Sequence, residues 1–319
     1  MAGRDLILLG AAHVHLDDHL RVADEEGWRV AHVHDRDAGR RARFCERLGA
    51  EPLDAPALLA GIAARGVIVC SETVHHAEDI GAALEAGLPV FTEKPLAGSA
   101  EAAEDLATRA EAAGTILHTN YFLRSNAGLA LVRDRIAAGA IGPVHHARMR
   151  FSHDGGFADW LDLHGWMTDP RRACYGGFAD EAVHCLDLLG WMLGPVADGA
   201  ARTGRALGLG TDDHGTAVLR FEGGATGVVE AGWTDMGMRL DIDILGRDGG
   251  IRLREGRIAR TRRGADGPVE TAALSPLDSG EGLRPFLSLL DGSRREPLVT
   301  PREAAEVNAL LDRMGLRLG

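Results

Sequence analysis

Short apolar runs alternate with amphipathic segments through the first third of the chain. Five apolar runs predict strands, at Asp5–Leu9, Arg29–His34, Val67–Cys70, Pro89–Thr92 and Thr115–Thr119. Apolar residues recur at helical spacing in three intervening segments, at Ala38–Leu48, His76–Ala86 and Ser99–Ala112. Each segment is followed closely by a glycine, which readily adopts the left-handed conformation that ends a helix. Strands that alternate with helices predict βαβ units and a parallel sheet covered on both faces.

The pattern changes after Tyr121. A helix, a strand and a second helix are predicted at Ala127–Ala138, Val144–Ser152 and Ala179–Leu193. Four strands follow, separated by tight glycine-containing turns, at Gly215–Phe221, Gly224–Thr234, Arg239–Leu245 and Gly250–Leu253. Strands joined in this way pair antiparallel. The expected fold class is therefore α/β, with a doubly wound parallel sheet in domain 1–121 and a mostly antiparallel sheet in an α+β domain, 122–319.

The charge balance and the cysteines narrow the function classes. The chain carries 35 Lys and Arg against 47 Asp and Glu, a formal net charge of −12. Nucleic-acid and anionic-membrane partners require clustered cations, so neither is expected. No apolar run approaches the roughly 20 residues that span a bilayer, and Cys45, Cys70, Cys174 and Cys185 are too scattered for a disulfide framework. No secretory signal precedes the first strand, so a cytoplasmic protein is expected.

The turn after the first predicted strand is a partial dinucleotide fingerprint. It reads Gly10-Ala11-Ala12-His13-Val14-His15, with only the first glycine of G-x-G-x-x-G. Such glycines let a pyrophosphate approach the backbone at a helix N-terminus. Asp35 ends the second strand, where a carboxylate accepts the ribose hydroxyls of NAD and repels the 2′-phosphate of NADP. Arg36 would offset that repulsion, so NADP is an alternative cofactor, and a helix cap is the structural alternative for Asp35.

Two motifs far apart in the chain resemble those of one family. The strand at Pro89–Thr92 runs into Glu93-Lys94-Pro95, and the segment Tyr175–Asp187 reads YGGFADEAVHCLD. Both resemble the glucose–fructose oxidoreductase and myo-inositol dehydrogenase family, Gfo/Idh/MocA, with its E-K-P signature and its G-G-G-x-x-D-x-G-x-H-x-x-D helix. Phe178 and Ala182 replace two of the family's glycines in the second motif.

The resemblance implies an NAD(P)-dependent sugar or polyol oxidoreductase with a Rossmann domain. It implies three catalytic residues, Lys94, Asp180 and His184, and a substrate site formed by Lys94, Arg124, Trp166, Asp180 and His184. It implies cofactor contacts from Gly10, Ala12, His13, Val14, Asp35, Arg36, Ser71, Glu72, His76, Glu93, Lys94 and Pro95. Glu72 stands where the family usually has a proline, which places a carboxylate near the nicotinamide side. The resemblance also implies a homodimer or a homotetramer.

The second motif has a physical basis that is independent of the family. Residues four apart share a helix face, so Asp180 and His184 point the same way. Histidine titrates near neutrality and can take the proton of a hydroxyl whose carbon loses hydride. Lys94 would lower the pKa of that hydroxyl electrostatically. An isolated Asp and His at this spacing would be an ordinary surface pair, but their occurrence together with Lys94 favours catalysis.

Other constellations lead to competing interpretations. His13 and His15 lie at a chelating spacing, but no third ligand accompanies them, so no metal site is expected. Trp160, Trp166 and Trp233 suit stacking on a sugar ring, with core packing as the alternative. Two further functions stay open on the same scaffold. One is a non-catalytic, dinucleotide-binding regulator, and the other is an enzyme that cleaves glycosides through transient oxidation.

Overall fold

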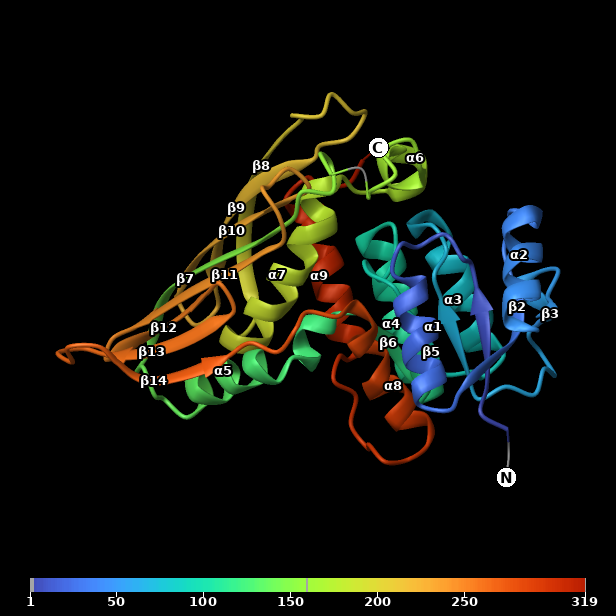
Figure 1. Cartoon of the computed structure of the whole chain (residues 1–319), viewed down its shortest axis with the longest axis horizontal. Helices are drawn as coiled ribbons and strands as arrows, with labels where there is room; N and C mark the ends of the chain where they lie inside the picture. Colours follow the sequence, from blue (N-terminus) through green and yellow to red (C-terminus); the bar gives the residue numbers. More distant parts are fainter. Residues whose placement is uncertain (1–2, 159, 319) are drawn as a thin grey trace. The chain divides into compact units, whose positions relative to one another are not determined.

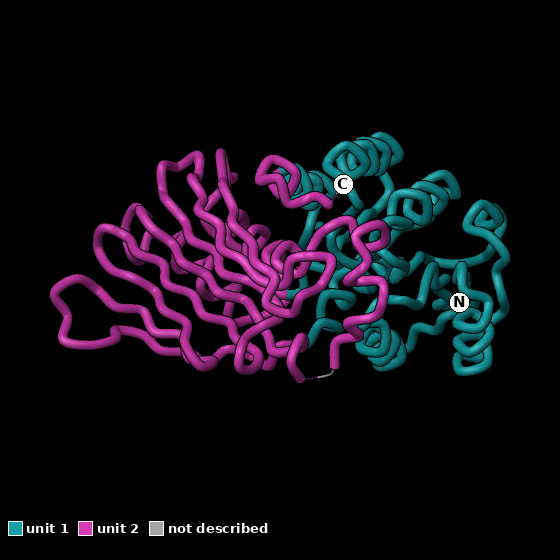
Figure 2. Tube along the Cα trace, turned by 90° about the horizontal axis from the view of Figure 1, so that it is seen from above, with its two compact units in different colours: residues 1–122, 278–309 teal, residues 123–277, 310–319 magenta. Residues whose placement is uncertain are grey.

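The computed structural model describes residues 3–158 and 160–318 and divides into two compact units. Unit 1 contains residues 1–122 and 278–309, and unit 2 contains residues 123–277 and 310–319 (Figure 2). The sequence predicts one domain over 122–319, whereas the segment 278–309 packs within unit 1. Local sequence patterns do not predict that segment 278–309 comes back to unit 1. Its position depends on which apolar surface its helices cover.

The sheet of unit 1 is parallel throughout. Its strands are β1 (Asp5–Leu9), β2 (Arg29–His34), β3 (Glu51–Pro52), β4 (Gly66–Val69), β5 (Val90–Thr92) and β6 (Leu117–Thr119). Their order across the sheet is β3-β2-β1-β4-β5-β6. This arrangement confirms the doubly wound parallel sheet. The two-residue strand β3 was not predicted, since it is too short for a periodic pattern.

Among the described residues, five α-helices lie wholly within unit 1, and Figure 1 labels them along the chain. They are α1 (Leu16–Glu25), α2 (Ala38–Leu48), α3 (His76–Glu85), α4 (Ala100–Ala113) and α8 (Leu283–Leu290). Short 3-10 helices across the chain are η1 (Pro56–Leu58), η2 (Thr73–His75), η3 (Phe122–Ser125), η4 (Trp166–Thr168) and η5 (Ser279–Gly282). The predicted bounds of α2 agree with the structure, whereas α1 and α8 were given no bounds from the sequence.

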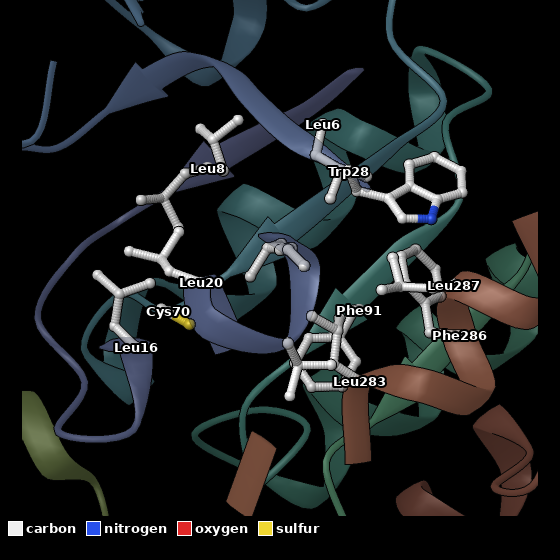
Figure 3. Close-up of a cluster of buried hydrophobic side chains, with 14 of the residues drawn as sticks. Leu6, Leu8, Leu16, Leu20, Trp28, Cys70, Phe91, Leu283, Phe286 and Leu287 are labelled. Atoms are coloured by element: carbon white, nitrogen blue, oxygen red, sulfur yellow. The ribbon is translucent and has the colours of Figure 1, made fainter. Parts of the chain in front are cut away.

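Buried apolar side chains from the sheet, α1 and α8 form one core cluster in unit 1. Figure 3 shows members of this cluster, including Leu6, Leu8, Leu16, Leu20, Phe91, Leu283, Phe286 and Leu287. Burying such a side chain contributes roughly 1.5–3 kcal/mol. Because α8 supplies three of these residues, the late segment 278–309 is part of the unit 1 core.

Unit 2 is built on an eight-stranded sheet in the order β14-β13-β12-β11-β7-β10-β9-β8. These strands are β7 (Val144–Ser152), β8 (Val196–Gly204), β9 (His214–Phe221), β10 (Thr226–Gly232), β11 (Arg239–Gly246), β12 (Gly249–Arg254), β13 (Arg257–Arg262) and β14 (Pro268–Ala273). Only the β7–β10 pairing is parallel among the pairings described. The mostly antiparallel second sheet is therefore confirmed, although β8, β13 and β14 were not predicted.

The remaining helices are α5 (Ala127–Ala137), α6 (Pro170–Ala173), α7 (Gly177–Leu193) and α9 (Pro301–Arg313). Helix α7 packs on β7, β9 and β10, on one face of the sheet (Figure 1). Most of its side chains are buried, so this helix forms the centre of unit 2. Within residues 3–158 and 160–318, no helix is both long and apolar enough to cross a membrane.

Candidate active site

The glycine turn of unit 1 connects β1 to α1 and brings two backbone segments into close contact. Gly10 has a φ of +75°, and a Cβ at this position would overlap with Ser71. Only glycine combines this conformation with so close an approach. The Gly10 amide donates to the carbonyl of His34 at 2.8 Å. The turn therefore ties the ends of β1, β2 and β4 together at one edge of the sheet.

The rest of this turn differs from a standard pyrophosphate loop. The amides of Ala12 and His13 both donate to the carbonyl of Cys70, at 3.0 and 3.1 Å. The first turn of α1 carries Asp17 and Asp18, and an interaction with His15 lowers the pKa of Asp18 to about 2. Carboxylates at a helix N-terminus compete with a bound phosphate for the positive end of the helix dipole. Val14, which lies in the turn between His13 and helix α1, is exposed.

Asp35 is buried at the end of β2 and accepts three hydrogen bonds. Its Oδ2 accepts from the Ala11 amide and from Nε of Arg40, both at 2.7 Å, and its Oδ1 accepts from the Asp37 amide at 2.7 Å. A carboxylate offers about four acceptor positions. The described contacts of Asp35 thus leave room for about one ribose hydroxyl. Arg40 was not identified from the sequence, because its link to Asp35 depends on the first turn of α2.

Arg36 is engaged by two acids of helix α3. Its guanidinium donates to Oδ1 and Oδ2 of Asp79 at 3.0 and 3.2 Å, and to Oε2 of Glu78 at 2.7 Å. Asp79 is fully buried, so this pairing is shielded from solvent. The sequence analysis expected Arg36 to weaken the repulsion of a 2′-phosphate. In the structure its charge is compensated from the neighbouring helix.

Glu72 links the loop after β4 to helix α2, and His76 links the same loop to the one after β5. Oε1 of Glu72 accepts from Arg40 at 3.2 Å. His76 is fully buried, with Nδ1 2.9 Å from the Pro95 carbonyl and Nε2 3.2 Å from the Ser71 carbonyl. Burial lowers the pKa of His76, despite these two carbonyls. A neutral imidazole donates through one nitrogen only, so we assign it to the shorter contact with Pro95.

Glu93 lies at the centre of a buried polar network. Its Oε1 is 2.6 Å from Nε2 of His19, accepts from Nδ2 of Asn120 at 2.9 Å and lies 3.6 Å from Nδ1 of His13. Burial by itself raises the pKa of Glu93, but His13 and His19 outweigh burial and hold this pKa well below its usual range. Glu93 is therefore ionised at neutral pH. His19 was missed by the sequence analysis, although it lies one helical turn after His15.

Lys94 follows β5 and is almost fully buried, with 3% of its surface exposed. Its backbone amide donates to Oε2 of Glu93 at 3.1 Å, and the Lys94–Pro95 peptide bond is cis. Glu93 thus fixes the backbone from which the lysine side chain extends. The strand, the glutamate network and the proline together determine where this cation lies within unit 1.

The N-terminus of α7 in unit 2 is held by Asp212. Its Oδ1 accepts from the Phe178 amide at 2.8 Å, and its carbonyl accepts from the Gly177 amide at 2.8 Å. A Cβ on Gly176 would overlap with the Asp212 carboxylate, and one on Gly177 would lie 2.7 Å from Cδ2 of Trp233. The two glycines are therefore required by close packing. This packing fixes the start of the helix that carries Asp180 and His184.

Asp180 and His184 are brought together by α7, one turn apart. Nε1 of Trp233 donates to Oδ2 of Asp180 at 2.9 Å. The imidazole of His184 is buried, and its ring lies edge-on to Phe151 with 5.3 Å between the centroids. Phe151 of β7 and Trp233, which directly follows β10, therefore contact the two side chains of the helix that the sequence predicts to be catalytic. Trp233 is fully buried, and its indole N–H gives it a polar role beyond core packing.

Arg124 is part of a buried ion pair with Asp187. Its Nε and Nη2 donate to the two carboxylate oxygens of Asp187 at 2.9 and 2.7 Å. Both residues are less than 5% exposed. Breaking such a pair leaves an uncompensated buried charge, which is strongly destabilising. This geometry favours a structural role for Arg124 over the substrate contact that the resemblance implies.

Two tryptophans near the start of α7 lie in different environments. Trp166 is buried within η4, whereas Trp160 is 48% exposed. The Trp160 ring lies 4.5 Å from the ring of His153, and Nε2 of His153 is 3.1 Å from Oε1 of Glu181. The sequence analysis did not identify the pair of His153 and Glu181. The two residues are 28 positions apart in the sequence, and they meet only because α7 packs on β7.

The described residues provide some groups that suit a dinucleotide and no cluster that suits a metal ion. Gly10 lets the turn after β1 pack directly against Ser71 at the end of β4, and Asp35 retains acceptor capacity at the end of β2. Both features lie at the carboxyl edge of a parallel sheet, where dinucleotides bind in this topology. Within 3–158 and 160–318, no group of three or more His, Cys, Asp or Glu side chains is placed to hold a metal ion.

Comparisons with known proteins agree with this architecture. A model of the oxidoreductase family with an NAD-binding Rossmann fold matches residues 7–121, and a model of the GFO/IDH/MocA C-terminal domain matches residues 129–252. The chain is 32% identical to myo-inositol dehydrogenase Hyg17 of Streptomyces leeuwenhoekii over 216 residues, which is 65% of this chain and 63% of the relative. It is 30% identical to 1,5-anhydro-D-fructose reductase of Ensifer adhaerens over 213 residues, 65% of this chain and 60% of the relative.

A solved structure shares the fold over nearly the whole chain. The oxidoreductase domain protein from Kribbella flavida superimposes with a TM-score of 0.87 at 23% identity, covering 99% of this chain and 96% of that one. The two sequence relatives are matched over less than two thirds of their own length. The two family models, in contrast, cover both the Rossmann region and the second domain in the family's order. The chain therefore belongs to the Gfo/Idh/MocA family of oxidoreductases, with an NAD-binding Rossmann fold in unit 1.

Proposed function

We propose that the protein is an NAD-dependent oxidoreductase acting on a hydroxyl or keto group of a sugar, inositol or sugar derivative. The observation that carries the proposal is the fixed arrangement of Asp180 and His184 on one face of α7, with Trp233 bonded to Asp180. The names of two relatives, an inositol dehydrogenase and an anhydrofructose reductase, support the substrate class.

In this proposal the side chains divide the work of alcohol oxidation. His184 takes the proton of the reacting hydroxyl, because a neutral imidazole nitrogen within reach of a hydroxyl can act as a general base. Lys94 stabilises the negative charge that develops on the oxygen. In the reverse direction His184 returns the proton to the oxygen of the keto group. No metal ion takes part, since a lysine supplies the cation.

Residues of unit 1 would hold the dinucleotide. Gly10 lets the backbone approach the pyrophosphate, and Asp35 accepts a ribose hydroxyl. When bound, the nicotinamide ring supplies the acceptor for the hydride. Glu93 holds the backbone amide of Lys94 and so positions the lysine for its task. The roles of these residues follow from their places in the family motifs and from their contacts in unit 1.

Asp180 favours a substrate with several hydroxyl groups. The carboxylate of Asp180 is a hydrogen-bond acceptor, and Nε1 of Trp233 donates to its Oδ2. A second hydroxyl beside the reacting carbon would donate to this carboxylate. A simple aliphatic alcohol lacks that donor, and a site built to bind a hydroxyl discriminates strongly against its absence.

The test is an assay of purified protein with NAD⁺ and a panel of cyclic polyols, hexoses and glycosides beside simple alcohols. NADH should form with at least one polyhydroxy compound, at a rate that exhaustive chelation leaves unchanged. Faster turnover of a simple alcohol than of every polyol would contradict the proposed substrate class. Activity that chelation removes and zinc restores would contradict the metal-free mechanism.

We also propose that the chain forms a homodimer or homotetramer through the open face of the unit 2 sheet. Side chains on this face are half-exposed and charged, with ion pairs between Arg148 and Glu230 and between Arg150 and Asp235. Val218 is 56% exposed on the same face. Light scattering should give a mass of two or four chains, and a monomer at micromolar concentration would contradict this proposal.

A further inference from the structure

A cluster of acids and arginines lies at the carboxyl ends of β2 and β4 in unit 1. Four carboxylates contact two guanidiniums there, an excess of two negative charges among the groups Asp35, Glu72, Glu78, Asp79, Arg36 and Arg40. Asp35 follows β2, Glu72 follows β4, and the other two acids lie in the first turn of α3. The cluster therefore surrounds the place where Asp35 would meet the adenosine ribose.

Arg40 is held from two sides. Its Nε donates to Asp35 at 2.7 Å, while its Nη2 donates to Glu72 at 3.2 Å. Both carboxylates are buried, with 1% and 7% of their side chains exposed. A guanidinium that donates to two buried carboxylates is strongly held, because charge-assisted hydrogen bonds strengthen where water is excluded. Glu72 is the residue that departs from the family's proline at this loop.

Arg36 is held in the same manner by helix α3. It forms a two-point contact with the buried Asp79 and a third hydrogen bond with Glu78. The first turn of a helix already favours acidic side chains, so Glu78 and Asp79 are stable there without the arginine. Arg36 therefore meets carboxylates that the helix itself stabilises.

We propose that Glu72, Glu78 and Asp79 set the cofactor preference by holding Arg40 and Arg36 in ion pairs, so that neither arginine receives a 2′-phosphate. The inference rests on the proposed function as a dinucleotide-dependent enzyme. A phosphate monoester adds roughly 1.5–2 negative charges near neutral pH. Brought to this cluster, it would meet an excess of carboxylates and would have to displace one of them from an arginine. NAD(H) adds only hydroxyl groups at the ribose and avoids this cost.

The inference separates the effect of Asp35 from the effect of the acids that hold the arginines. If Asp35 alone decided the preference, neutralising Glu72 or Glu78 would change little. If the ion pairs decide it, removing either charge weakens the hold on one arginine, although Arg40 keeps its bond to Asp35 and Arg36 keeps its bonds to Asp79. Glu72→Gln and Glu78→Gln keep the size of the side chain and an oxygen acceptor, so they remove charge with little loss of packing. Glu78 is largely exposed, which makes its variant a safe one for folding.

The experiment measures the dissociation constants of NADH and NADPH by calorimetry for the wild type, Glu72→Gln, Glu78→Gln and the double variant. Glu85→Gln is the matched control, because it removes an exposed acid from the far end of α3. The wild type should bind NADH more tightly than NADPH. We expect the NADPH affinity to rise on the order of 10-fold in Glu72→Gln, with NADH affected less than about 3-fold. Adding Arg40→Gln to Glu72→Gln should reverse that gain.

Each outcome is decisive for the inference. The inference is supported if the NADPH affinity rises in Glu72→Gln and Glu78→Gln but not in Glu85→Gln. Arg40→Gln should also reverse the rise in Glu72→Gln. If the wild type and all variants bind NADH, and the ratio of NADPH affinity to NADH affinity is the same in each, the inference is overturned. The proposed function would then still stand. A wild type that binds NADPH as tightly as NADH overturns the inference as well. A folded wild type that binds neither dinucleotide would overturn both this inference and the proposed function.

Discussion

The imidazole of His19 and the carboxylate of Glu93 lie 2.6 Å apart inside unit 1, and both side chains are fully shielded from solvent. His19 comes from α1, the helix after the glycine turn, and Glu93 directly precedes Lys94. The contact therefore links the segment that would bind the pyrophosphate to the segment that carries the lysine. It gives Glu93 a positioning role, because the same carboxylate also holds the backbone amide of Lys94 at 3.1 Å.

This network predicts a specific dependence of stability on pH. The pKa of Glu93 is held well below its ordinary value of 4.5, so its contribution to stability is present above pH 4.5 and is lost as the pH falls toward the folded-state pKa. One such group gives a slope of up to about 1.4 kcal/mol per pH unit in that window. Denaturant unfolding at several pH values should therefore show a shallower acid slope for Glu93→Gln than for the wild type. Equal slopes would show that His13 and His19 do not lower the pKa of Glu93.

Trp233 is expected to orient Asp180 through its indole N–H. Trp233→Phe keeps a smaller aromatic ring and loses the hydrogen bond to Oδ2, so turnover should fall on the order of 10-fold, since a bond to a charged group is worth about 1.5–3 kcal/mol. Trp160→Phe is the matched control, because its N–H lies 3.4 Å from Asp154, away from Asp180. Steady-state kinetics with the best polyol compare the two. Similar turnover in both variants would remove Trp233 from the site.

Arg124→Ala should act on folding. The variant leaves Asp187 buried without its two-point partner, which costs about 3–5 kcal/mol. We expect a clear loss of thermal stability in Arg124→Ala, and a comparable loss in Asp187→Ala. If Arg124 instead contacts the substrate, the melting temperature would stay near that of the wild type while KM rises. Thermal unfolding together with KM distinguishes the two roles.

Much of the fold follows from local patterns in the sequence. The bounds of β1, β2, β7 and α2 agree with the predicted segments, because each combines a periodic apolar pattern with a clear start or end. Other elements were missed for two different reasons. Strand β14 has a mostly exposed surface, and α8 buries its apolar face against a sheet formed some 200 residues earlier in the chain.

The site shows the same division between local and long-range information. The pairing of Asp180 with His184 needs only helical spacing, so the sequence is sufficient to propose it. The partners of these groups are distant in the chain, as with Trp233, which follows β10 and lies 53 residues after Asp180. Arg36 is the clearest case of a long-range effect. Its charge pointed to NADP as an alternative, yet acids 42 and 43 residues away compensate it.

We expect Lys94 and His184 to carry out the oxidation of a hydroxyl group without a metal ion. The most direct measurement is the turnover number for NADH formation in the wild type, Lys94→Ala and His184→Ala, with the best polyol at saturation. We expect each variant to lose on the order of 10²–10⁴-fold in turnover while it retains its melting temperature and its affinity for NADH. A folded variant that binds NADH and turns over at nearly the wild-type rate would contradict the role assigned to that residue.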